Sequence, residues 1–268
     1  MKRALSLGFL ALIAYVLFLF VTFPAARAYQ YIADQFPANI KLYGLKGSVW
    51  SGKAELITLA SQQYSNASWH FQPKSLFVGE ALFYVDLDNG QSQIKGNVGL
   101  NWSQSLILRD LVLQQELVDL QALAQTSAIV AGKISGRVEN IVLSRTRITE
   151  ASGKFVLRDT ALLLPRRTEW GDFKLDISKS DSDVLMKLSD QGGPLLANGT
   201  IVVDENNAYQ VDLAVQAASG ASNDLIQGVD LFGRPGNDGK VHLKYNGSLS
   251  ELLGVKSNGG SINSDNPA

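Results

Sequence analysis

The sequence predicts a mainly β protein in which an N-terminal transmembrane helix precedes an elongated, curved antiparallel β-sheet domain with a few short helices. Three observations support this fold class. Residues 4–26 carry no charged side chain, short stretches after Pro37 alternate apolar with polar residues, and turn sequences separate those stretches. Because successive side chains of a strand point to opposite faces, this alternation predicts a sheet with one apolar and one polar face.

The uncharged segment is long enough to cross a membrane. As an α-helix, residues 4–26 would measure about 35 Å at roughly 1.5 Å per residue, whereas a hydrocarbon core is about 30 Å thick. Lys2 and Arg3 precede the segment, and positive charge beside a first span tends to stay in the cytoplasm. We therefore expect a single-pass anchor with the N-terminus in the cytoplasm and the remaining chain outside it.

Two other interpretations of this segment are open. Ala26-Arg27-Ala28 has the small-x-small form of a signal-peptide cleavage site, although the apolar run is longer than the roughly 7 to 15 residues of a usual signal peptide. A buried core helix is the third interpretation. An uncleaved anchor agrees best with the length of the run.

Composition changes mark three expected domains. A helical pattern continues through Tyr29, Ile32 and Phe36, and Pro37 ends it. The last twelve residues are rich in Ser, Asn and Gly, which predicts disorder. The expected division is a membrane anchor with a juxtamembrane extension at residues 1–36, a β-domain at 37–256 and a disordered tail at 257–268.

Alternating stretches and turn sequences predict hairpins. Residues 83–87 alternate, Asp88-Asn89-Gly90 supplies a turn, and residues 94–102 alternate again. The same pattern recurs at 173–177, 209–215 and 241–245. Further turns are expected at Asn198-Gly199, 204–207, Asp238-Gly239 and Asn246-Gly247.

Two short helices interrupt the strands. The spacing of leucines predicts one helix over 115–125. A second begins near Ser222, turns Leu225, Ile226, Val229 and Phe232 inward, and ends at Gly233. We expect this second helix to cover the apolar face of the 209–215 strand, namely Tyr209, Val211, Leu213 and Val215.

Few residues suit catalysis or ligand chemistry. The chain has no cysteine and a net charge of −1, which excludes thiolate chemistry and gives no electrostatic footprint for nucleic acid. His70 and His242 lie in strand-like stretches and should face solvent, and Asp181 and Asp183 belong to a turn. We therefore expect no enzyme activity, no cofactor and no metal site.

One glycine-rich segment surrounds a tryptophan. Gly44, Gly47 and Gly52 punctuate a strand around Trp50, and glycine within a strand often permits a bend or a close backbone approach. We expect Trp50 to pack over a depression that these glycines create in the core. An exposed contact is the alternative.

This segment resembles the G-x-x-G-x-x-W-x-G-x-A motif of the type II secretion system protein N family. Three further stretches resemble the family in the same order: 69–79, 192–199 and 231–239. The positions carried over, as structural or interaction residues, are Gly44, Gly47, Trp50, Gly52, Trp69, Pro73, Gly193, Pro194, Gly233, Pro235, Asp238 and Gly239. The family offers no catalytic residue to carry over.

The resemblance implies an accessory subunit of the machinery that exports folded proteins across the outer membrane. We expect a bacterial inner-membrane protein whose periplasmic β-domain is a scaffold or docking component, with other type II secretion subunits as partners and membrane lipids around the anchor. The alternative is a lipid-binding or lipid-transfer β-groove, similar in style to AsmA-like proteins. A partly open apolar face would favour this alternative.

Overall fold

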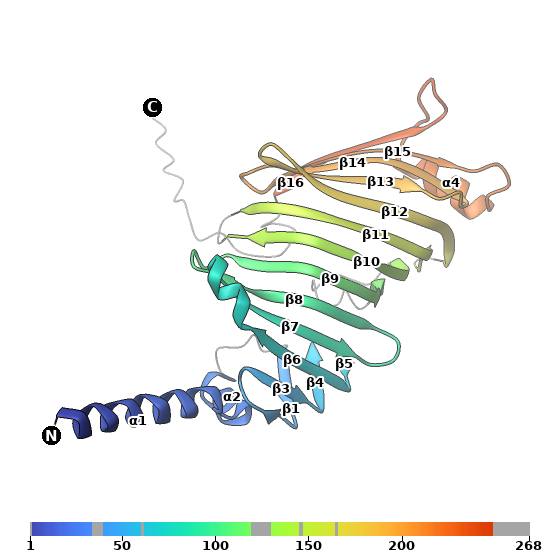
Figure 1. Ribbon diagram of the computed structural model, residues 1–268. Coiled ribbons are helices and arrows are strands. Elements are labelled where there is room, and N and C mark those ends of the chain that lie inside the picture. Colours follow the sequence, from blue (N-terminus) through green and yellow to red (C-terminus); the bar gives the residue numbers. More distant parts are fainter. Residues whose placement is uncertain are drawn as a thin grey trace, which may run out of the picture.

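The computed structural model describes residues 2–33, 40–59, 62–118, 130–144, 147–163 and 166–248. Within them the chain forms one large, twisted antiparallel sheet, with helices at its two ends (Figure 1). The sheet contains thirteen strands, and almost every strand pairs with its sequence neighbours. Antiparallel neighbours need only short turns between them, so the long row of strands follows from the predicted hairpins.

The strand order can be followed from one end of the sheet to the other. It is β16 (Val241–Ser248), β15 (Ala208–Ala217), β14 (Leu195–Val203), β13 (Asp183–Asp190), β12 (Thr168–Ser180), β11 (Ile148–Leu162), β10 (Val130–Leu143), β9 (Leu106–Glu116), β8 (Gln93–Asn101), β7 (Glu80–Asp88), β6 (Asn66–Gln72), β3 (Ser51–Ala54) and β2 (Lys46–Gly47). A second, three-stranded sheet consists of β1 (Ile40–Tyr43), β4 (Leu56–Leu59) and β5 (Gln62–Tyr64).

Helical segments lie at the margins of the sheet. They are α1 (Lys2–Val21), α2 (Ala25–Ile32), the 3₁₀ helix η2 (Pro73–Val78) and α4 (Asn223–Phe232). In Figure 1, α1 leaves the sheet on the side where η2 lies, and α4 lies at the opposite side. We call the strand ends beside α1 and η2 the α1 edge, and the opposite strand ends the α4 edge.

The strand register gathers most of the apolar side chains on one face. Phe83 lies opposite Val98, which lies opposite Leu108, and Leu213 lies opposite Leu243. Residues directly opposite each other in a pair share a face, so this apolar face continues from β3 to β16. Register shifts between β8 and β9, β10 and β11, and β11 and β12 are bulges, which bend a sheet.

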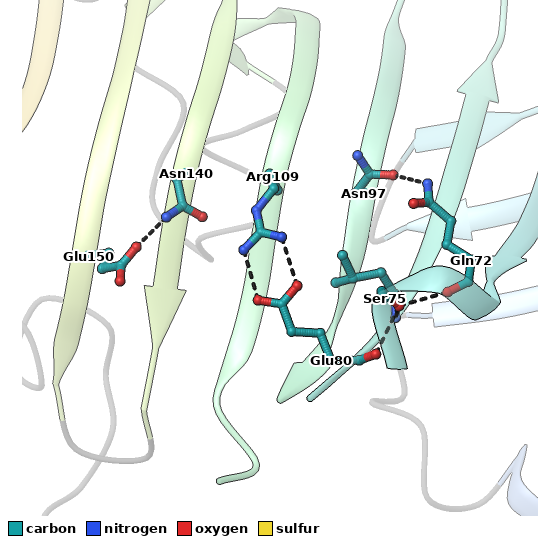
Figure 2. Close-up of polar contacts among 8 residues, drawn as sticks. Gln72, Ser75, Glu80, Asn97, Arg109, Asn140 and Glu150 are labelled. Carbon is teal, nitrogen blue, oxygen red and sulfur yellow. Dashed lines mark hydrogen bonds and ion pairs between the residues drawn. The ribbon is translucent and has the colours of Figure 1, made fainter. Parts of the chain in front are cut away.

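Polar contacts between strands line the other face (Figure 2). The Arg109 guanidinium donates two hydrogen bonds to the Glu80 carboxylate, at 2.7 and 2.9 Å. Gln72 Nε2 donates to Asn97 Oδ1 at 2.5 Å. The opposite character of the two faces agrees with the alternation in the sequence.

Most predicted hairpins are confirmed. The turn at 88–90 joins β7 to β8, and the turn containing Asp181 joins β12 to β13. The turn predictions at Asn198-Gly199 and Asn246-Gly247 are wrong, because these pairs lie within β14 and β16. Gly247 instead allows the Tyr209 side chain to lie close to the backbone of β16, because a Cβ at this position would lie 2.7 Å from the Tyr209 hydroxyl oxygen.

The two helix predictions have different outcomes. Ser222 caps α4 by accepting a hydrogen bond from the Leu225 amide at 3.3 Å, so the predicted start and end are confirmed. The other predicted helix begins too early, because Gln115 and Glu116 still belong to β9. Residues 119–129, which contain the rest of that helix, lie outside the described residues.

The N-terminal segment is helical over Lys2–Val21, and α2 follows at Ala25–Ile32. Among the residues that the structure describes, no helix meets both the length and the apolar character required of a membrane span. The predicted anchor therefore stays a prediction. The proposed boundary at residue 37 and the tail at 257–268 lie outside the described residues.

The Glu80–Arg109 pair predicts a pH dependence of stability. The hydrogen bond from Arg109 lowers the pKa of Glu80 below its ordinary value of 4.5. A lowered pKa in the folded state stabilises the fold above the unfolded pKa, and this contribution is lost as the pH falls through the folded pKa. Glu80→Gln should reduce the free energy of unfolding by about 1 kcal/mol at pH 7, and the difference should shrink below pH 4.5.

Urea unfolding of the full chain over this pH range measures the effect. Glu55→Gln is the control, because Glu55 pairs with Lys46 in an exposed position and should change stability much less. An unchanging difference between wild type and Glu80→Gln at all pH values would contradict the argument.

Candidate interaction surfaces

The glycine-rich segment joins the N-terminal helices to the sheet. Val49 donates its amide hydrogen to the Phe23 carbonyl at 3.0 Å, and Pro24 forms a β-bridge with Ser48. Trp50 Nε1 donates to the Phe20 carbonyl at 2.8 Å. These contacts attach the end of α1 and the start of α2 directly to the residues that precede β3.

Aromatic rings extend this junction into the sheet. The Trp50 ring centroid lies 4.7 Å from that of Phe20 and 5.1 Å from that of Phe71, and Phe71 lies 5.1 Å from Phe83. Such spacings are typical of favourable aromatic pairs. The four rings link α1 with β6 and β7.

The predicted packing of Trp50 is therefore wrong, because this half-buried ring bridges to α1 instead of filling a glycine depression. The depression itself exists, and Trp69 occupies it: a Cβ at Gly52 would collide with the Trp69 indole ring. Trp69 Nε1 also donates to the Val49 carbonyl at 2.9 Å. Sequence spacing could not distinguish the two tryptophans, because β4 and β5 separate β3 from its partner β6 along the chain.

The family-motif residues form two separate groups. Gly44, Gly47, Trp50, Gly52 and Trp69 lie around β2, β3 and β6, and Pro73 opens η2 at the same edge. Gly193, Pro194, Gly233, Pro235, Asp238 and Gly239 lie near the ends of β14, α4 and β16. The structure thus places the motifs at opposite ends of the sheet instead of in one site.

The second group supports the turn around α4. The Pro194 carbonyl accepts a hydrogen bond from the Ala218 amide at 2.8 Å, and Ala218 lines the same hollow as Pro235 and Gly239. Asp238 Oδ2 lies 3.0 Å from His242 Nε2. Hydrogen bonds from the Lys240 amide and from His242 lower the pKa of Asp238.

An exposed apolar cluster at the α1 edge was not predicted. Phe77, Trp102 and Val78 are 91%, 77% and 72% exposed, and Leu76 and Leu100 are also exposed. The Trp102 amide donates to the Gly79 carbonyl at 3.0 Å, which holds the turn after β8 against η2. We call these five residues the edge patch. Its signal in the sequence is the apolar run 76–78, which does not alternate.

The apolar face of the large sheet has a cover at each end. At one end Leu225 and Val229 of α4 pack against Phe173, Val215 and Val241. At the other end Ile57 of the small sheet packs with Ala54 and Ala67. In addition, Gln115 Nε2 donates to the Tyr64 hydroxyl at 2.6 Å.

Helix α4 covers less of β15 than the sequence predicts. Val215 is buried beneath it, as expected, but Val211 and Leu213 are only half-buried. Tyr209 packs against a different cluster that contains Val184 and Val203. Ile226, predicted to face inward, is exposed, and the side chain of Phe232 lies outside the described residues. The helix is too short to reach along the whole strand.

Residues with catalytic or ligating potential remain dispersed. His70 and His242 are exposed on their strands, as predicted. In the part of the chain that the structure describes, no three acidic or histidine side chains converge as a metal site would require. The surfaces suited to interaction are therefore the edge patch and the apolar face.

The two tryptophans predict different stability effects. Trp69→Ala should lower the free energy of unfolding by about 3 kcal/mol, because the ring fills the space above Gly52. Trp50→Ala should cost about 1 kcal/mol, since it removes one hydrogen bond and two ring contacts at a partly exposed position. Denaturant unfolding of the two variants checks the order, and a larger loss for Trp50→Ala would contradict it.

Comparison with known proteins agrees with the motif positions. The sequence model of the family described as "Type II secretion system (T2SS), protein N" matches residues 38–244. A protein of Aeromonas hydrophila named "Type II secretion system protein N" is 23% identical over 258 residues, which cover 93% of this chain and 100% of that protein. No solved structure matches the chain significantly. The match across most of the chain shows that it belongs to the type II secretion system protein N family.

Proposed function

We propose that this chain is an accessory inner-membrane subunit of the type II secretion system, with its β-sheet in the periplasm as a scaffold or docking component. The family match over residues 38–244 carries this proposal. It covers the whole large sheet apart from the last residues of β16. Because the motif positions surround both ends of this sheet, we infer that the sheet itself makes the functional contacts of the molecule.

The edge patch supports the proposed placement at a membrane. Residue Phe71, near the end of β6, contacts Trp50, which contacts the end of α1, and η2 follows β6 directly. The patch and the proposed anchor therefore leave the sheet at the same edge. Exposed phenylalanine and tryptophan side chains favour the boundary between lipid and water.

The outer edge of β16 supports the docking role. In the described part of the chain β16 pairs with β15 and with no other strand, so it is the end strand of the large sheet. Such an edge can accept a strand from another protein. Tyr245 is exposed on this strand and provides a large amphipathic contact.

A lipid-binding groove is the second candidate function. The observation that favours it is the continuous apolar face, which among the described residues the small sheet covers near β3 and at Gln115 of β9, and which α4 covers at the other end. Between these covers, Val98 and Leu108 remain half-buried. Apolar surfaces of this extent on soluble domains usually contact a partner or a lipid.

Topology is tested first. A reporter that is active only outside the cytoplasm, fused after Gly254, should be active and should remain in the membrane fraction, because the uncharged segment follows Lys2 and Arg3. A soluble product that begins near Tyr29 would instead show cleavage of a signal peptide.

Membrane contact of the edge patch is tested with single cysteines, which label cleanly because the chain has none of its own. A polarity-sensitive fluorophore on Phe77→Cys should be quenched by quencher-bearing phospholipids when the full chain is in nanodiscs. Gln91→Cys, at the opposite end of the same β7–β8 hairpin, is the control and should not be quenched. Tyr15→Cys reports separately on the anchor, so quenching at position 15 without quenching at position 77 would reject only the patch.

Docking is tested by photo-crosslinking in intact cells. A photo-activatable residue in place of Tyr245 should form adducts with another subunit of the secretion system, because it lies on the free edge strand. The same residue in place of Gln91 serves as the control. Absence of any such adduct at position 245 would count against a docking role for β16.

A further inference from the structure

An apolar cavity of about 300 Å³ lies between α4 and the large sheet. Leu188, Leu213 and Leu243 line it from the sheet, and Leu225 and Val229 line it from the helix. It adjoins the buried cluster beneath α4. The cavity is therefore a gap that the packing of α4 leaves in the apolar face, at the α4 edge.

The two threonine hydroxyls and the carboxylate around the cavity are engaged by protein groups. Thr160 Oγ1 donates to the Gly171 carbonyl at 2.5 Å, and Thr168 Oγ1 donates to the Arg166 carbonyl at 3.2 Å. Asp224, the charged residue in the lining, pairs with Arg166 at 3.8 Å. Trp170 adds one indole N–H, for which the described residues supply no acceptor, so the lining offers a polar ligand little, whereas an apolar ligand needs no hydrogen bond.

Gly228 keeps the cavity open. It lies within α4 and faces the cavity, and a Cβ placed on it would meet no atom within 4 Å. Glycine inside a helix costs about 1 kcal/mol relative to alanine. A larger residue would fill the space and would also favour the helix, so the fold keeps room here at the expense of its own stability.

We propose that this cavity holds the segment of a lipid acyl chain next to its head group. The inference rests on the second candidate function, in which the apolar face contacts lipid. The lining matches an alkyl chain in polarity, and Leu213 and Leu243 belong to both the cavity and the apolar face. The remainder of the acyl chain can therefore lie along the apolar face.

The rim of the cavity suits an anionic head group. The Arg166 guanidinium is largely exposed, and its ion pair with Asp224 is long, so the pair is weak and the arginine can turn to a phosphate or carboxylate. A free fatty acid and a phospholipid share this chemistry. The experiment described below distinguishes a free fatty acid from a phospholipid.

The experiment places the probe on the ligand and leaves the cavity unmodified. Cells that express the full chain are fed a fatty acid carrying a diazirine and an alkyne and are then irradiated. The adducts are enriched through the alkyne and located by mass spectrometry. We expect label on peptides from α4, β15 or β16.

Two variants decide whether the cavity is responsible. Gly228→Leu should reduce labelling of these peptides about tenfold, because its side chain occupies the cavity, and it should keep or raise the melting temperature. Gln227→Leu adds the same side chain at the neighbouring exposed position of α4 and should leave labelling unchanged. Unreduced labelling in Gly228→Leu, or no label on these peptides in wild type, would overturn the proposal.

The same data distinguish the cavity from the groove as a whole. Label on the β9 peptide around Leu108 without label near α4 would support the groove and reject the cavity site. Label near α4 alone would support the cavity and reject a continuous groove. A strain that cannot esterify the fed fatty acid separates the two ligand sources, because only a free fatty acid would still label the protein there.

Discussion

The strand register that keeps most apolar side chains on a single face is the constraint on which the rest of the structure depends. The pairs Phe83–Val98 and Leu213–Leu243 belong to the same face although eight strands lie between β7 and β16 in the sheet. A one-residue slip in any hairpin would move apolar side chains to the polar side. The polar pair Glu80–Arg109 opposes such a slip, because each charged group must stay either hydrated or paired with the other.

The junction at Trp50 determines how the N-terminal helices relate to this sheet. Its indole contacts a backbone carbonyl and a ring of α1 on one side and a ring of β6 on the other. A glycine-rich loop alone would let the sheet swing freely about α1, whereas several short contacts around one tryptophan restrict that swing. The motif glycines allow the close backbone approach, and Trp69 packs over Gly52 and stabilises the pairing of β3 with β6.

The sequence was sufficient for features that depend on local pattern. Alternation predicted the two-faced antiparallel sheet, and Ser222 and Gly233 predicted both ends of α4. Features that depend on partners distant in the chain were not accessible. The depression at Gly52 was predicted but assigned to Trp50, because only the β3–β6 pairing brings Trp69 over it. The sequence around Gly199 is typical of a turn, and only the structure shows that this glycine allows a close approach to β15. Predicting the edge patch would have required knowing that η2 and the turn at Trp102 lie together.

The two candidate roles are compatible in one molecule and meet at β16. Protein docking would use the outer edge of β16, where Tyr245 lies opposite Val211 at the margin of the apolar face. Lipid contact would use the apolar face and the cavity, where the lining is almost wholly apolar. The cavity lies beneath α4, and Figure 1 shows α4 on the side of the sheet away from α1, so a lipid held there is distinct from the lipids that would surround the anchor. An acyl chain in this position would instead complete the core beneath α4, and lipid occupancy would thereby stabilise the end of the sheet that carries the docking strand.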